Sequence, residues 1–519
     1  MNIHIVFAIL IVFGIGCLVG TIPIIQNFPF PIGYDSINYY LPTLYDLNSN
    51  PDIGGELFPV YMFLVYTFYL IFFSDLYFAY NVVNIVLYGS FGVTIFLLIK
   101  NVLRQPVDKS IFFAIFVMFQ LSTLRMEWDL HRDILALIFL NLCLVTINTT
   151  MKSFVLNKFV LLQYISMSII YVATIFSDRM IGSLLIISSI FLSILHKLKL
   201  LCIINLLILI LFLTYFLLID DVTFVSISSN PIDVLLNPVF NKNNLFPYDL
   251  LVLYLSLNGI LIPFFIIGFL KKSGSLTLKI PTFVTIMLSF SWLIVPNYGY
   301  LVPERWIILS GFFISIFGLY GFFLLVDRLA NSKLKNLISV LFISSFVTYG
   351  ILFMILPYGI VFTIPSVFQN QTSLTFPLSM SFNSLETSKN QDLVKSIEWI
   401  NSNTENNSEV IGTMHWRGWF HLFLENPRQY IFSETLSLRT DNSTKEKNMV
   451  GLYNLLKSKI DYQCGNKVET FINTSSAFGN ERNIYFIDLK SGYYNPQGYH
   501  PIVYDSEYFN IYKITDSFC

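Results

Sequence analysis

Charged residues and cysteines are scarce in this chain of 519 residues. Charged residues make up 12%, about half of the roughly 25% usual in soluble domains, whereas hydrophobic residues make up 55% and the mean hydropathy is +0.65. The formal net charge of −1 excludes a basic nucleic-acid-binding protein. Five cysteines exclude a disulfide-rich scaffold, and their spacing contains no zinc or redox motif. Most of the chain is therefore expected to lie in a lipid bilayer.

Apolar runs of spanning or near-spanning length occupy the chain up to residue 357. Eleven of them fall at about 3–25, 76–99, 110–124, 132–149, 159–176, 181–196, 200–219, 249–270, 280–295, 306–326 and 337–357. A twelfth run, 57–73, is followed at once by Ser74 and Asp75. The pattern predicts a mostly α-helical, polytopic membrane protein with about 11 transmembrane helices, and a juxtamembrane helix at 57–73.

The distribution of basic residues predicts the orientation. With the N-terminus in the cytoplasm and 57–73 along the outer face, the inner loops hold 13 basic residues and the outer loops five. If 57–73 crossed the membrane, this bias would invert for every later loop, against the positive-inside rule. The prediction is a multi-pass cell-membrane protein whose C-terminal domain is extracytoplasmic.

The last 162 residues have the charge density of a soluble domain. The sequence therefore predicts a transmembrane catalytic domain at 1–357 and an extracytoplasmic α/β or α+β domain at 358–519. Helical spacing occurs at Ser396–Asn401, and strand patterns occur at 410–411, 430–432, 484–489 and 509–514. Cys464 and Cys519 are the only cysteines of this domain, and either a disulfide or two free thiols fits them.

The first outer loop, 26–56, is acidic and contains no Lys or Arg. Asp46 and Asp52 fit a solvated connector. Asp35 follows Gly33-Tyr34 closely after the first apolar run, where the membrane restricts water. An ionisable residue at such a place is a functional candidate.

The second outer loop is denser, with six ionisable groups among the nine residues from Arg125 to Asp133. Glu127, Asp129 and His131 alternate, which predicts an irregular or extended turn that presents them on one side. Carboxylates there suit an acceptor or a divalent cation, Mg²⁺ or Mn²⁺, with Glu127 and Asp129 as ligands. A self-neutralised cluster of ion pairs fits the segment equally well.

Arginine is the preferred basic residue of the predicted outer face. Of the five outer basic residues four are Arg, whereas 11 of the 13 inner ones are Lys. The arginine side chain grips phosphate through two parallel hydrogen bonds. Arg132, Arg179 and Arg305 are therefore the candidate ligands of a phosphate, with Asp178 and Glu304 beside them as supporting residues. Ion pairs that snorkel to the membrane surface are the alternative.

Five segments resemble the GT-C superfamily of polytopic glycosyltransferases, and more narrowly its dolichyl-phosphate-mannose protein mannosyltransferase type. They are PIGYDSINYY at 31–40, EWDLHRDILAL at 127–137, FSDRMIG at 176–182, VPERWIIL at 302–309 and SIEWINSNTENNSEVIG at 396–412.

The resemblance implies a catalytic acid/base at Asp35, supported by Tyr34. It implies a metal or acceptor site at Glu127, Asp129 or Asp133, and we include the neighbouring His131 in that site. It also implies a lipid phosphate near Arg305. The implied activity transfers a sugar from a polyprenyl (dolichyl) phosphate to a hydroxyl of a protein, lipid or glycan, with inversion. A metal ion is optional in such enzymes.

Three alternatives remain open at this stage. Oligosaccharyltransferases resemble this pattern in their first-loop aspartate, but His415-Trp-Arg-Gly-Trp419 lacks the acid of their WWDYG motif. Trp416 and Trp419 either contact an acceptor or form a packed turn. A lipid-linked-sugar flippase and a membrane-anchored adaptor are the non-enzymatic alternatives.

Overall fold

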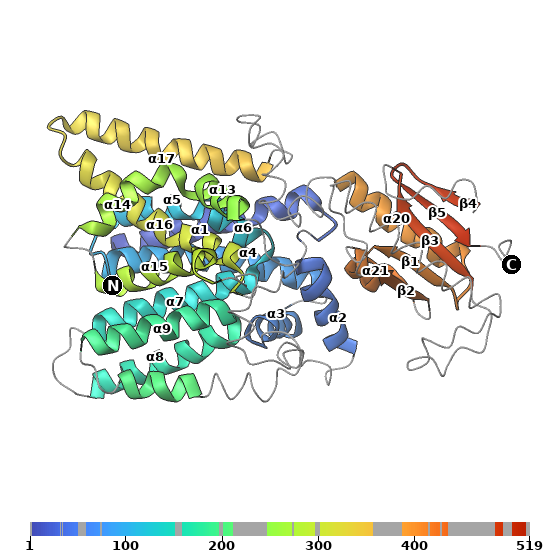
Figure 1. Cartoon of the computed structure of the whole chain (residues 1–519), viewed down its shortest axis with the longest axis horizontal. Coiled ribbons are helices and arrows are strands. Elements are labelled where there is room, and N and C mark those ends of the chain that lie inside the picture. Colours follow the sequence, from blue (N-terminus) through green and yellow to red (C-terminus); the bar gives the residue numbers. More distant parts are fainter. Residues whose placement is uncertain are drawn as a thin grey trace. The chain divides into compact units, whose positions relative to one another are not determined.

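The structure is a computed structural model. It describes residues 3–31, 33, 35–49, 59–72, 75–150, 158–196, 201–210, 247–271, 275–295, 301–355, 387–413, 416–425, 428–433, 483–490 and 501–514. The chain forms two compact units (Figure 1). The first contains Met1–Gln26 and Gly54–Ser381, and the second contains Asn27–Ile53 and Phe382–Cys519. The first outer loop therefore belongs to the same unit as the C-terminal part of the chain.

The first unit is a bundle of apolar helices. Its helices are α1 (Ile3–Asn27), α3 (Pro59–Phe72), α4 (Leu76–Asn101), α5 (Val107–Met118), α6 (Leu121–Asp129), α7 (His131–Thr150), α8 (Lys158–Ser177), α9 (Arg179–Leu195), Leu201–Ile210, α13 (Pro247–Asn258), α14 (Ile262–Leu270), α15 (Leu276–Ser289), α16 (Pro303–Val326) and α17 (Ser332–Ile355). Each of the eleven predicted runs contains helix where the structure describes it, although 110–124 is interrupted at Phe119-Gln120 and 280–295 leaves the α-helix after Ser289. The prediction of a mostly α-helical polytopic membrane protein is confirmed.

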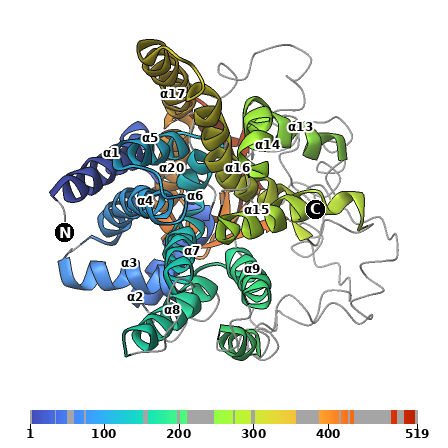
Figure 2. The ribbon, with the colours of Figure 1, turned by 90° about the vertical axis from the view of Figure 1, so that its left-hand side faces the viewer.

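Helix α16 is the core of this bundle. It is apolar around its whole circumference and almost wholly buried, as expected for a helix enclosed by others. In the end-on view of Figure 2 it lies among α14, α15 and α17. Gly321 of α16 meets Gly268 of α14 so closely that a Cβ on either would collide with a carbonyl oxygen of the other helix. Small residues thus allow the two backbones to touch.

Two predicted spans are broken rather than continuous. The run 110–124 is divided at Phe119-Gln120 into α5 and α6, which are bent by 60°. The run 249–270 contains a 3-10 turn, η3 (Gly259–Leu261), between α13 and α14. Among the described residues, six helices are long and apolar enough to cross a membrane, or seven if the bent pair counts as one span. The number of eleven crossings remains a prediction.

Helix α3 bears on the predicted orientation because it is short. Its 14 residues are about 21 Å long, which is less than the roughly 30 Å of a bilayer core. This length fits a helix that lies along the membrane, but α15, which is predicted to cross, is equally short, so the orientation remains a prediction. Asp75, whose carboxylate accepts a hydrogen bond from the Phe78 amide at 2.7 Å, caps the next helix, α4.

We therefore expect the connection between α3 and α4 to be extracytoplasmic. In a variant without the five native cysteines, Ser74→Cys keeps the Asp75 cap and should react with an impermeant thiol reagent added to intact cells. Ser332→Cys, in a predicted inner loop, should react only after the cells are opened. The reverse pattern would refute the orientation.

In the part that the structure describes, the second unit contains a mixed sheet and four helical segments. It begins with η1 (Ser36–Tyr40) and α2 (Leu41–Ser49) and continues with α20 (Thr387–Asn403), β1 (Glu409–Thr413), α21 (Arg417–Phe423), β2 (Gln429–Ser433), β3 (Ile484–Leu489), β4 (Ile502–Asp505) and β5 (Phe509–Ile514). The strand order is β2-β1-β3-β5-β4. Strands β1, β2 and β3 are parallel, and β5 is antiparallel to β3 and β4. The predicted helix and four predicted strands are all present, whereas β4 was not foreseen.

A single apolar core joins one face of this sheet to the helices. This face carries Val410, Tyr485, Ile487 and Ile511, which lie on three strands. Within a strand, successive side chains point to opposite faces, so every second residue reaches the core. These four side chains pack against Leu393, Val394, Ile397 and Ile400 of α20, Trp416, Trp419 and Phe420 at α21, and Ile37 of η1. Cys464 and Cys519 lie outside the described residues.

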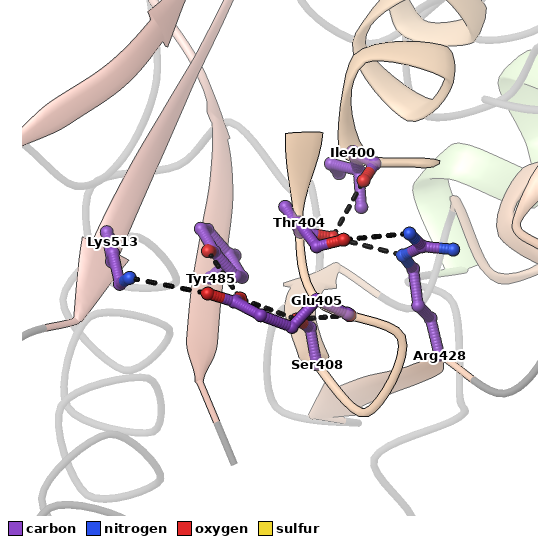
Figure 3. Close-up of polar contacts among 7 residues, drawn as sticks. All are labelled: Ile400, Thr404, Glu405, Ser408, Arg428, Tyr485 and Lys513. Carbon is purple, nitrogen blue, oxygen red and sulfur yellow. Dashed lines mark hydrogen bonds and ion pairs between the residues drawn. The ribbon is translucent and has the colours of Figure 1, made fainter. Parts of the chain in front are cut away.

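Arg428 closes the C-terminus of α20, as Figure 3 shows. Its guanidinium donates to the carbonyl oxygens of Asn401 at 2.6 Å and Thr404 at 2.8 Å, and to the Thr404 hydroxyl at 3.1 Å. Carbonyls at a helix end have no partner within the helix, and a cation there also complements the helix dipole. Arg428 is buried, so no water replaces these bonds when it is removed.

We expect Arg428→Met to destabilise the C-terminal domain by about 2–4 kcal/mol, since charged hydrogen bonds are lost and carbonyls stay buried. Hydrogen exchange of the β1 and β3 amides in the full chain measures this free energy of unfolding. Lys490→Met is the control, because Lys490 makes only a surface ion pair with Asp505 and should cost less than about 1 kcal/mol. Equal effects would show that Arg428 does not hold the helix end.

Glu405 links the end of α20 to the sheet (Figure 3). Its carboxylate accepts a hydrogen bond from the Tyr485 hydroxyl at 3.0 Å and lies 3.9 Å from Nζ of Lys513. Its own backbone amide, and then these groups, hold the pKa of Glu405 below its usual value. Burial and the adjacent carboxylate raise the pKa of Tyr485 to about 12. At neutral pH Glu405 is therefore ionised and Tyr485 is protonated, so the hydrogen bond between them persists.

Candidate functional site

Asp35 precedes a π-helix. Residues Ser36–Tyr40 form this single wide turn, η1, and α2 continues from it. The π-helix is rare and occurs frequently at functional sites. Asp35 is partly exposed and its side chain makes no capping hydrogen bond to the turn. This helical geometry was not predicted, since Gly33 and the prolines of the loop suggested turns.

The other acidic residues of the first loop have different surroundings. Asp46 of α2 lies 3.0 Å from Nε2 of His421 on α21, so it contacts the C-terminal part of its unit rather than solvent alone. Asp52 lies outside the described residues, and so does the predicted supporting residue Tyr34. The structure therefore describes Asp35 as the acidic residue directly before the π-helix.

In the first unit, Arg132, Asp133, Asp178 and Arg305 form one cluster. Nε of Arg132 lies 3.6 Å from Oδ1 of Asp133 and 3.6 Å from Oδ2 of Asp178. The charges of Asp178 and Arg305 also act on the Asp133 carboxyl. Asp133 and Asp178 are buried, and Arg132 is largely buried. The sequence predicted these four residues separately, and the fold brings them together from α7, α9 and α16.

Helix ends hold this cluster. Asp178 caps α9 by accepting a hydrogen bond from the Ile181 amide at 2.9 Å, and Arg179 is the first residue of that helix. Glu304 and Arg305 lie in the first turn of α16, directly after Val302, whose φ of 48° is left-handed. For a β-branched residue this conformation is strained, and such strain gathers at functional sites.

The segment 125–133 is not the extended turn that the alternation predicted. It is helical except at Leu130, where α6 ends and α7 begins one residue later. Its side chains therefore diverge. Oε1 of Glu127 packs against Gly20 of α1, where an added Cβ would lie only 3.0 Å away. The ring of His131 lies between those of Tyr61 and Tyr80, at centroid distances of 6.2 and 5.7 Å.

This divergence bears on the predicted metal ion. Within the part of the chain that the structure describes, no three His, Cys, Asp or Glu side chains are gathered as metal ligands. The side chain of Asp129 is not among those described. The pairing of Glu127 with Asp129 around a cation is therefore untested, and the metal ion remains a prediction.

The cluster combines two arginines with two carboxylates. The carboxylates of Asp133 and Asp178 form ion pairs with Arg132, and a guanidinium carries five N–H donors. Preorganised guanidinium groups in a site of low water content stabilise an anion strongly. Ion pairs, one of the alternatives that the sequence left open, are present at Arg132, whereas a phosphate at these arginines remains a prediction.

Comparison with solved structures shows the fold. The structure of ArnT from Cupriavidus metallidurans bound to undecaprenyl phosphate matches with a TM-score of 0.51 and 11% identity, over 98% of this chain and 98% of that chain. The apo ArnT structure matches with a TM-score of 0.52 and 12% identity, over the same shares. An oligosaccharyltransferase from Archaeoglobus fulgidus matches with a TM-score of 0.49 and 12% identity, over 93% of this chain and 69% of that chain. No protein-family profile and no curated protein sequence matches the chain.

Proposed function

We propose that this multi-pass membrane protein, which has the GT-C fold, is a glycosyltransferase that takes its sugar from a polyprenyl phosphate. The observation that carries the proposal is the likeness to ArnT over nearly the whole length of both chains. That protein was solved with undecaprenyl phosphate bound, so the fold accommodates a lipid phosphate. The arginine-rich cluster of the first unit supplies the matching chemistry.

The proposed reaction is one direct displacement. The acceptor oxygen bonds to the anomeric carbon, the bond from that carbon to the phosphate oxygen breaks, and the configuration inverts. Asp35 takes the proton of the acceptor hydroxyl, and polyprenyl phosphate leaves with the bonding electrons. General-base catalysis of this kind is worth about 10²–10⁴ in rate.

The arginines are assigned to the leaving group. Negative charge grows on the phosphate as the glycosidic bond breaks, and Arg132, Arg179 and Arg305 are the proposed donors that stabilise it. Asp133 and Asp178 hold Arg132 in place, as their 3.6 Å distances indicate. Glu304 is the proposed support of Arg305, its neighbour in α16.

The remaining assignments are also proposals. The acceptor hydroxyl belongs to a protein, lipid or glycan on the extracytoplasmic face, with mannose as the proposed sugar. His131 and Glu127 are retained as acceptor contacts, and Mg²⁺ or Mn²⁺ as an optional ion. The test is label transfer: membranes that contain the chain should move radiolabelled mannose from polyprenyl phosphate to an acceptor, and membranes without it should not.

A lipid-linked-sugar flippase is the second candidate, and one observation favours it. Broken helices such as α5/α6 and α13/η3/α14 are typical of transporters, where they form substrate sites. A flippase would move the donor across the bilayer without breaking the bond between sugar and phosphate. The two functions therefore differ in their products.

A further inference from the structure

We propose that helix α21 of the C-terminal domain positions Asp35, with Gly418 and Asn38 as the positioning residues. This inference rests on the proposed function, because it gives the C-terminal domain a task in the same reaction. Asp35, η1 and α21 belong to one compact unit, so the contacts between them are part of its packing.

The closest contact joins Gly418 to the π-helix. The amide of Gly418 donates a hydrogen bond to Oδ1 of Asn38 at 2.9 Å. A Cβ at Gly418 would collide with the carbonyl oxygen of Ile37 and lie 2.8 Å from Cα of Asn38. Only glycine allows α21 to approach the backbone of η1 this closely. The contact lies two and three residues after Asp35.

Apolar packing fixes the same turn on both sides. Ile37 is fully buried in the core of the C-terminal domain, together with Trp416 and Trp419. Phe30, before Asp35, meets the Trp419 ring edge-on at a centroid distance of 6.0 Å. Trp416 and Trp419 therefore form the packed turn that the sequence left as one of two alternatives, and their rings hold the Asp35 segment.

A support of this kind is needed because η1 is a single turn of five residues. With the nine residues of α2 that follow it, η1 forms one short helical segment, and isolated helices shorter than about 12–15 residues are marginal in water without tertiary packing. A general base must lie within hydrogen-bond distance of its proton, and a misplacement of about 1 Å can cost up to about a hundredfold in rate. The structure thus points to the C-terminal domain as the part that holds the base in place.

The test compares four variants of the full-length protein in detergent or liposomes. Gly418→Ala and Asn38→Ala remove the two halves of the contact, and Asn38→Asp restores an acceptor of the same shape. Ser506→Ala is the matched control, because it removes the hydrogen bond from the Ser506 hydroxyl to Oδ2 of Asp392 on α20, in the same domain. The readouts are kcat, KM for polyprenyl-phosphate mannose, and hydrogen exchange of the amides at 36–41.

We expect Gly418→Ala and Asn38→Ala to lower kcat about tenfold, to leave KM unchanged and to speed exchange at 36–41. Asn38→Asp should recover most of kcat, and Ser506→Ala should change neither kcat nor this exchange. Wild-type kcat in both disrupting variants, or an equal loss in Ser506→Ala, would overturn the inference.

Failure of the proposed function gives a different result. In that case Asp35→Asn would be as active as the wild type, or no variant would transfer sugar. Exchange at 36–41 would then still decide the contact: faster exchange in Gly418→Ala and Asn38→Ala alone supports α21 as the support of this turn, and unchanged exchange overturns it.

Discussion

Asp35→Asn should lower sugar transfer from a polyprenyl phosphate by two to four orders of magnitude. The amide keeps the size and polarity of the carboxylate but cannot accept the proton of the acceptor hydroxyl. Donor binding should largely survive, because the donor phosphate is assigned to arginines of the first unit. Initial rates with labelled polyprenyl-phosphate mannose, together with an equilibrium binding measurement on the same donor, check both parts.

The control must come from the same loop. Asp46 is unsuitable because it contacts His421 at 3.0 Å and so contributes to the packing of α2 on α21. Asp52→Asn makes the same chemical change in the same predicted loop, and it should leave the rate within a factor of about two. A folded Asp35→Asn protein with the wild-type rate would end the assignment of Asp35 as the base.

Arg305→Lys should weaken donor binding about tenfold to a hundredfold. The lysine keeps the positive charge beside Asp133 but loses the planar pair of N–H donors that matches a phosphate. Loss of one charge-assisted hydrogen bond costs about 1.5–3 kcal/mol, which corresponds to this range. Titration of the purified protein with undecaprenyl phosphate measures the effect.

The exposed Arg328, in a predicted inner loop, supplies the matched control. Arg328→Lys should bind undecaprenyl phosphate as the wild type does. The same comparison applies to Arg132→Lys and Arg179→Lys. If all three arginine-to-lysine variants bind undecaprenyl phosphate as the wild type does, these arginines form ion pairs at the membrane surface and do not bind the donor phosphate.

The sequence predicted the helices well, because a bilayer demands long apolar runs that composition alone reveals. It did not predict the break at Phe119-Gln120, where apolar residues continue on both sides. It also misjudged 125–133, because alternating charges suggested an extended turn, whereas α6 and α7 continue through it. Alternating charged residues indicate an extended segment only where the adjacent residues do not themselves form helices.

The residues of the candidate site could be predicted from the sequence, but the contacts between them could not. Charged side chains avoid the bilayer core, so Arg132, Asp178 and Arg305 could be assigned to one membrane face from sequence. Their pairing depends on helices that are distant along the chain. The role of Gly418 was hidden for the same reason, since Asn38 lies 380 residues away. A glycine between two tryptophans was the one visible sign of a close backbone approach.

The most direct test of the central claim is to follow the donor itself. Purified full-length protein in liposomes is given polyprenyl-phosphate mannose, labelled in both lipid and sugar, together with solubilised membrane acceptors. The proposed glycosyltransferase releases polyprenyl phosphate, transfers the sugar label to an acceptor, and leaves nucleotide-linked mannose untouched. Movement of intact donor across the bilayer, with no release of polyprenyl phosphate, would contradict an enzyme and identify a transporter.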